Sequence, residues 1–182
     1  MKGLVNVEKY GLVIRNNFRK DWAKSKKIFV RKSVAEALLR AKSFLPKGYN
    51  FEIHDGKRSI EDQRRIIKIC EKDLKNKFPA SWKGRLVTFT GGYKSLRMKL
   101  PRNTHRHGGA IDLTILDKNG KQLDMGGRKF NSTSKLNYYE NRKNLTEKQK
   151  LTRKNRQLLK RVMKRSGFIE NLDEWHHWGY SR

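Results

Sequence analysis

Apolar residues recur at helical spacing in three stretches of the chain, and each stretch opens with side chains suited to cap a helix. The capping residues are Ser33 with Glu36, Ser59, and Thr146 with Gln149. The three helices are predicted to stop at Pro46 and Gly48, at about Phe78, and near Gly167. The last of them is long, basic and amphipathic.

Alternation of apolar and polar residues predicts strands between these helices. Residues 49–54 alternate in this way and run into the turn Asp55-Gly56. The segment Ala110–Leu116 (AIDLTIL) is also strand-like, and the turn residues Asp117–Gly120 follow it, so we expect a hairpin that leads towards LDMGG. The chain closes with Phe168 and the segment EWHHWGY, which is expected to add a further strand.

The pattern is weakest between Pro79 and Thr104, a stretch rich in Gly, Trp and basic residues. We expect irregular connections there, with a short strand at Leu86–Phe89. No repeat, linker or low-complexity segment divides the chain. The order of elements therefore predicts an α+β fold, a small antiparallel sheet flanked by helices, in a single domain that spans residues 1–182.

The charge of the chain is strongly one-sided, with 45 Lys and Arg against 17 Asp and Glu and a formal net charge of +28. A hydrophobic content of 35% still allows a folded core beneath this basic surface. The basic residues crowd at Lys24–Lys32 and at Lys148–Arg165. Such charge predicts attraction to a polyanion, and it leaves nucleic acid, an anionic wall polymer and an acidic membrane surface as candidates.

Cys70 is the single cysteine, so no internal disulfide can form. It lies in the apolar stripe of a predicted helix, where we expect a small buried hydrophobe rather than a nucleophile. No run of about 18 apolar residues occurs, and residues 1–22 show neither the uninterrupted apolar region nor the small-residue cleavage signature of a secretory leader. The sequence as written is therefore expected to be cytoplasmic and without a transmembrane segment, and a secreted or wall-associated location stays open if a leader has been removed.

Histidines and carboxylates gather in two short segments, THRHGGAID and DEWHHW. Zinc prefers imidazole nitrogen and carboxylate oxygen where thiolates are absent, and a catalytic site keeps one position open for water. Gly108 and Gly109 permit a sharp change of direction, so His105 and Asp112 can converge on one metal. On these residues alone, surface histidines with a turn-capping aspartate are an equally good interpretation.

Both segments resemble motifs of the D-alanyl-D-alanine dipeptidases of the vancomycin-resistance type. The segment that begins at His105 (H-x-x-G-x-A-x-D, then L-T) resembles their first metal motif, and the Glu-Trp-His-His segment at Glu174 is similar to their Glu-Trp-x-His element. Leu123–Gly126 (LDMG) and Asp55–Arg58 (DGKR) resemble two further landmarks of the family. The four occur in the same order and cover about residues 49–178.

The resemblance implies a metallopeptidase with one zinc ion held by His105, Asp112 and His177. It implies that Glu174 is the catalytic base and acid, and that Arg58 stabilises the transition state. Glu174 could take a proton from the zinc-bound water and return it to the leaving amine. The guanidinium of Arg58 could face the oxyanion that develops on the carbonyl.

The chain departs from the family pattern at several positions. Asn103 replaces the serine usually found two positions before the ligand histidine, and Thr104 is expected to supply the substrate-binding hydroxyl instead. Lys57 stands where the family commonly has Tyr, and His176 where it commonly has Trp. These departures concern the substrate more than the metal.

Neighbouring histidines compete for the metal, since His107 lies close to His105 and His176 beside His177. The motif spacing favours His105 and His177. Because side chains alternate along a strand, the last segment must bend for Glu174 and His177 to reach one metal. Three further residues are expected to have supporting or packing roles: His54, Trp175 and Trp178.

The leading hypothesis is zinc-dependent hydrolysis of a D-amino-acid peptide bond, with D-Ala-D-Ala as the substrate. A peptidoglycan stem-peptide D,D-carboxypeptidase or endopeptidase is the alternative, because a charge of +28 suits an anionic wall better than a neutral dipeptide. A hypothesis from another class is a basic polyanion- or nucleic-acid-binding protein with incidental histidines, although no helix-turn-helix or paired-cysteine signature supports it. A metal-bound protein that has lost catalysis is disfavoured by the presence of Glu174.

Overall fold

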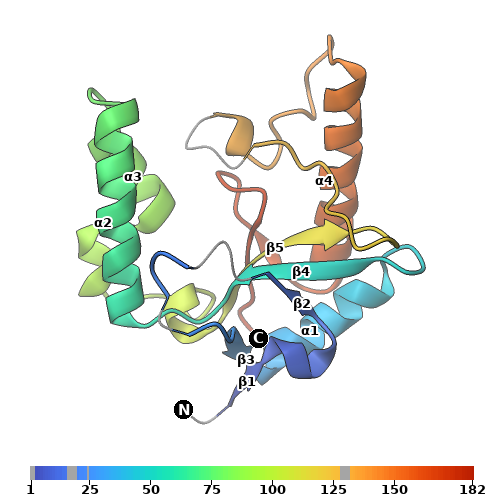
Figure 1. The fold of residues 1–182 in the computed structure, drawn as a ribbon, viewed down its shortest axis with the longest axis horizontal. Helices are drawn as coiled ribbons and strands as arrows, with labels where there is room; N and C mark the ends of the chain where they lie inside the picture. The colour runs from blue at the N-terminus through green and yellow to red at the C-terminus, as the bar shows by residue number, and fades with distance from the viewer. Residues whose placement is uncertain (1–2, 16–19, 24, 128–131) are drawn as a thin grey trace.

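A central sheet with helices on either side organises the chain (Figure 1). The computed structural model describes residues 3–15, 20–23, 25–127 and 132–182. Lys24, which opens the first basic cluster, lies outside the described residues. The predicted α+β fold is confirmed.

The main sheet has five strands in the order β2 (Val13–Ile14), β4 (Asn50–Asp55), β5 (Ala110–Leu116), β7 (His177–Gly179) and β6 (Ile169–Glu170). The four strands from β4 to β6 are antiparallel, as expected, whereas the short edge strand β2 runs parallel to β4. A second, two-stranded sheet joins β1 (Leu4–Asn6) to β3 (Phe29–Arg31). The predicted hairpin after β5 is reduced to one bridge, between Leu116 and Gln122.

The described helices are α1 (Lys32–Ser43), α2 (Ile60–Lys77), α3 (Trp82–Thr90) and α4 (Glu147–Arg165). Short 3-10 turns lie at Val7–Tyr10, Tyr93–Leu96, His105–His107 and Ser132–Ser134, labelled η1, η3, η4 and η5. The predicted capping box of Thr146 with Gln149 forms on α4, and the predicted cap Ser59 forms a capping box with Asp62 on α2. In Figure 1, α2 and α3 stand together on one side of the sheet and α4 stands on the other.

The predicted capping box of Ser33 with Glu36 was wrong. The N-cap of helix α1 is Arg31, two residues before Ser33, and it makes no side-chain capping bond. The Ser33 hydroxyl instead donates to the carbonyl of Arg182. Strand β3 runs directly into α1, so the strand rather than a capping side chain sets where the helix starts.

The predicted strand at Leu86–Phe89 was also wrong, because these residues belong to α3. Leu86 points into a small core that it shares with Ile67 and Leu74 of α2. Gly91, with φ of +72°, ends the helix in the left-handed conformation that glycine adopts readily. Packing against α2 therefore decides the structure of a segment whose own pattern is weak.

The two faces of the main sheet differ in character, and this difference positions the site. Alternate residues of β4 and β5, such as Ile53 and Leu113, join the larger core together with residues of α1 and α4. The residues between them on the opposite face are buried and polar: Glu52, His54, Asp112 and Thr114. Buried polar side chains need hydrogen-bond partners, so a binding or catalytic site is expected on this face of the sheet.

Candidate metal centre and active site

Strand register places three polar residues side by side. Asp112 on β5 pairs with Asp55 on β4 and with His177 on β7. The pairing of β4 with β5 shifts between Ile53 and Asp55, which is the signature of a bulge. Without this shift, regular pairing would place His54 rather than Asp55 opposite Asp112. The bulge therefore selects which side chain of β4 faces the site.

His105 reaches the same place from the loop before β5. His105 is the first residue of η4, and Gly108, with φ of +66°, is the C-cap of this 3-10 turn. A Cβ atom at Gly109 would lie 1.9 Å from the carbonyl oxygen of Arg102, so only glycine fits there. The carbonyl of His105 accepts a hydrogen bond from the Arg58 backbone N–H at 3.0 Å. The expectation that the two glycines turn the chain so that His105 and Asp112 converge is confirmed.

The two histidines and the aspartate could together hold one metal ion. His105 Nε2 lies 3.2 Å from His177 Nδ1 and 3.3 Å from Asp112 Oδ1, and His177 Nδ1 lies 3.0 Å from the same oxygen. Ligand atoms bound to zinc at about 2.0–2.1 Å in a tetrahedron are separated by about 3.3 Å. The spacing of the three donor atoms therefore fits zinc coordination.

The hydrogen bonds of the site prepare His105 to be a ligand. Its Nδ1 donates to the carbonyl oxygen of Gly56 at 2.6 Å, so in the neutral ring Nε2 carries the lone pair that faces the other two donors. Burial raises the pKa of the Asp112 carboxyl, but His105 and His177 beside it outweigh this effect and hold the pKa well below its usual range. Asp112 is thus an anionic carboxylate between two imidazoles.

Arg58 connects the site to β4 and α2. Its Nε donates to Asp55 Oδ2 at 2.6 Å, its Nη2 to Asp112 Oδ2 at 3.3 Å and its Nη1 to Gln63 Oε1 at 3.2 Å. Burial lowers the pKa of Arg58, but the carboxylates of Asp55 and Asp112 overcome this and raise it. The guanidinium therefore stays charged within the site.

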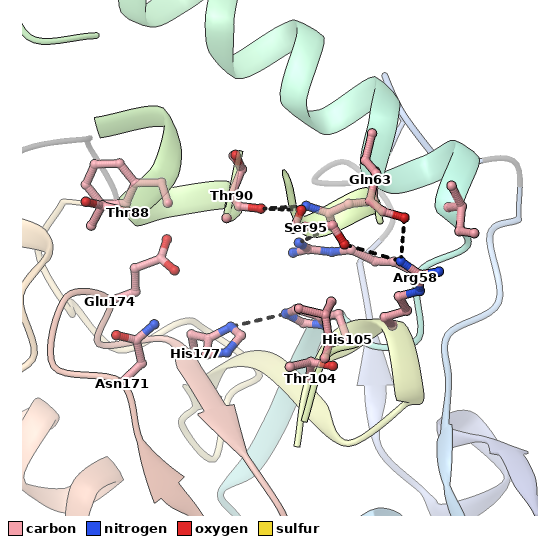
Figure 2. Close-up of a pocket in the computed structure, with 16 residues that line it drawn as sticks. Arg58, Gln63, Thr88, Thr90, Ser95, Thr104, His105, Asn171, Glu174 and His177 are labelled. Carbon is pink, nitrogen blue, oxygen red and sulfur yellow. Dashed lines mark hydrogen bonds between the residues drawn. The ribbon is translucent and has the colours of Figure 1, made fainter. Parts of the chain in front are cut away.

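Glu174 lies beside His177 because the chain turns between them. The N–H of His177 donates to the carbonyl of Glu174 at 3.1 Å, and Trp175 and His176 form the turn before β7 begins. The expected bend is therefore present. In the view of Figure 2, Glu174, His177, His105 and Arg58 follow one another across the cavity, with Glu174 at one end and Arg58 at the other.

These residues line a cavity of about 220 Å³ between α2, α3 and the loop before β7. Thr104 lines it too, although its hydroxyl donates to the Pro101 carbonyl at 2.9 Å. The cavity also contains residues that the sequence did not single out: Gln63, Thr88, Phe89, Thr90, Ser95, Arg106 and Asn171. They come from α2, α3, η3, η4 and the segment before β7, so tertiary packing rather than a local sequence motif brings them to the site.

The competing histidines lie outside the donor cluster, although His176 Nε2 is 3.7 Å from Glu174 Oε1. His107 is exposed, and the ring of His176 packs edge-on against Trp175, 5.3 Å away between centroids. His54 lies 2.8 Å from Glu52 Oε1, beside but outside the donor cluster. Trp178 is fully buried in the core, and Trp175 is nearly so. The burial of the two tryptophans agrees with the packing roles expected for them, and the supporting role of His54 stays a prediction.

Cys70 packs beside the small core of α2 and α3 and is partly buried. Burial raises the pKa of its thiol to about 11. A thiol with such a pKa is protonated near neutral pH, which agrees with the expected structural role.

An acidic residue beside two imidazoles and a carboxylate that could share one metal ion is the arrangement typical of single-metal hydrolases. A sequence model of the family described as D-ala-D-ala dipeptidase matches residues 5–181. The chain therefore belongs to this peptidase family.

A curated relative, a D-alanyl-D-alanine dipeptidase of Synechocystis sp., is 32% identical over 80 residues. That match covers 41% of this chain and 32% of the relative. Within the described residues, no helix combines the length and the apolar character that a membrane span requires.

Proposed function

We propose that this protein is a zinc-dependent peptidase that hydrolyses the bond between two D-alanine residues. The observation that carries the proposal is the cluster of His105 Nε2, Asp112 Oδ1 and His177 Nδ1, whose separations of 3.0–3.3 Å suit one tetrahedral ion. Family membership supports peptide hydrolysis as the reaction. Two imidazoles and a carboxylate, without thiolates, favour zinc over harder ions.

Bound zinc would supply a Lewis acid and lower the pKa of a coordinated water to about 7. Glu174 is proposed to take a proton from the attacking water and deliver it to the leaving amine. Three of the five N–H donors of Arg58 bind Asp55, Gln63 and Asp112 among the described residues, so the remaining donors can address the carbonyl oxygen as charge develops. Thr104 is proposed to accept a hydrogen bond from a substrate N–H, since its hydroxyl proton already points to Pro101.

A stem-peptide D,D-carboxypeptidase or endopeptidase is the second candidate. The net charge of +28 favours it, because a strongly cationic surface attracts an anionic wall and its precursors. The same charge would serve an anionic wall polymer as partner, whereas nothing in the site requires nucleic acid.

The test is release of D-alanine from D-Ala-D-Ala and from a stem peptide by zinc-loaded protein. Glu174→Gln should keep zinc, measured as bound metal per chain, and lower kcat by about 10²–10⁴-fold. Glu170→Gln, which removes a carboxylate that pairs with Lys164 outside the cavity, is the matched control and should keep activity. Cleavage of the stem peptide alone would favour the second candidate. Cleavage of neither substrate by metal-replete protein would refute the peptidase assignment.

A further inference from the structure

A second cavity adjoins the one that holds the proposed metal ligands. It has a volume of about 320 Å³ and shares Thr88 and Phe89 with the first cavity, so the two lie on either side of these α3 residues. Asp173, next to Glu174 in the chain, also lines it. The second cavity therefore neighbours the Glu174 end of the first, across the shared residues Thr88 and Phe89.

Among the described residues, the second cavity is lined by two cations and one anion. Arg85 comes from α3 and Lys135 from the segment after η5, and Asp173 is the carboxylate among these described lining residues. Arg85 is held in place, since its Nε donates to Ser81 Oγ at 3.0 Å and its guanidinium lies 4.0 Å from the centroid of the Phe78 ring. The balance favours a negatively charged occupant.

A buried arginine fixes the backbone that carries Lys135. Arg156 of α4 is 3% exposed, and its guanidinium donates to the carbonyls of Thr133 and Lys135 at 2.8 and 2.7 Å. Its Nε donates to the carbonyl of Met125 at 2.8 Å. Hydrogen bonds from α4 therefore hold the backbone on both sides of Ser134, at the rim of the second cavity.

The orientation of the substrate in the proposed reaction decides which part of it would enter the second cavity. If Arg58 faces the carbonyl oxygen and Glu174 protonates the leaving amine, the leaving segment starts at the Glu174 end of the cavity, which is opposite Arg58 in Figure 2. The second cavity lies on the Glu174 side of the first, because Asp173, Thr88 and Phe89 border it.

We infer that the second cavity receives the leaving segment of the substrate, and that Arg85 and Lys135 select a segment with a negative charge beyond its first residue. This inference rests on the proposed peptidase function and names its substrate class: peptides longer than a dipeptide on the leaving side. For D-Ala-D-Ala-Gly, water would add across the first peptide bond, so that the hydroxyl joins the D-Ala carbonyl carbon and the proton passes to the amine of released D-Ala-Gly.

The test compares D-Ala-D-Ala-Gly with its C-terminal amide, which differs only in the terminal charge. Zinc-loaded protein should cleave the acid with a higher kcat/KM than the amide, measured as D-Ala-Gly or its amide by mass spectrometry. Each cation should contribute about two- to fivefold, since exposed ion pairs are weak. Lys135→Gln and Arg85→Gln should each reduce the preference by that factor. Lys83→Gln is the control: Lys83 is an exposed cation on α3, and it is not among the described residues that line either cavity. This variant should preserve the preference.

Equal cleavage of acid and amide by the wild type would overturn the inference. So would a preference unchanged in Lys135→Gln and Arg85→Gln, or cleavage of D-Ala-D-Ala without cleavage of either tripeptide. Because Arg85 also packs on Phe78, its variant is checked by thermal unfolding, and the exposed Lys135 provides an independent result. If zinc-loaded protein cleaves none of the three peptides, the proposed function itself fails and the inference falls with it.

Discussion

Replacement of Arg58 by alanine is expected to destabilise the fold as well as to impair hydrolysis. The Arg58 side chain is 14% exposed, and its guanidinium lies 2.6 Å from Asp55 and 3.3 Å from Asp112, whose side chains are 0% and 5% exposed. Without the guanidinium, two buried carboxylates would lose their shared cation. Removing one partner of a buried ion pair costs about 3–5 kcal/mol, because the other charge is left buried without compensation.

This cost can be converted into a melting temperature. For a domain of this size, each kcal/mol shifts the midpoint by about 2–4 °C, so Arg58→Ala should lower the midpoint by roughly 6–20 °C. The measurement is thermal unfolding monitored by tryptophan fluorescence. Metal-free protein is used so that loss of metal does not contribute to the change in the midpoint. Arg58→Lys keeps the charge without the planar fork and should fall between the two proteins.

A double-mutant cycle with Asp55→Ala separates the ion pair from other effects. Asp55 Oδ1 also accepts the Gly56 N–H at 2.8 Å, so the single Asp55 variant loses this bond as well. If the pair stabilises the fold, Arg58→Ala should cost less in the Asp55→Ala background, with a coupling energy of about 1–3 kcal/mol. Strictly additive costs, or an unchanged melting midpoint in Arg58→Ala, would refute this account. The role of Arg58 would then be limited to the substrate, without a contribution to the stability of the fold.

Two further predictions test the metal centre and the cysteine. Zinc at 1,000 times its dissociation constant should stabilise the protein by about 4 kcal/mol, which raises the melting midpoint by roughly 8–16 °C, and chelation should reverse this shift. Asp112→Asn should lose most of the zinc-dependent shift. A full shift in that variant would contradict the ligand assignment. Burial raises the pKa of the Cys70 thiol from 9.0 to about 11. Native protein at pH 8 should therefore react with iodoacetamide about 100-fold more slowly than unfolded protein, and the rate should climb as the pH approaches 11. Equal rates in the two states would show that burial does not protect the thiol.

Local signals in the sequence predicted much of the fold. Strand β5 was predicted with its observed bounds, and the caps of α2 and α4 formed at Ser59 and Thr146, because alternation and capping depend on neighbouring residues alone. Strand β2 was missed because its two residues form a strand only by pairing with β4. Helix α3 was missed for a similar reason, since its packing on α2 is a long-range contact.

The candidate site was predicted through motifs, but its geometry depends on two irregularities that no periodicity reveals. The bulge of β4 brings Asp55 opposite Asp112, and Arg58 can then hold both carboxylates. The turn before β7 lets Glu174 and His177 line one cavity, although regular alternation would separate them. If either segment were a regular strand, the three donor atoms could still meet, but the cation or the carboxylate proposed to act beside them would point elsewhere. The polar sheet face thus carries Asp112 and His177, the turn before β5 adds His105, and the interruptions of the sheet position Arg58 and Glu174, which are proposed to act in catalysis.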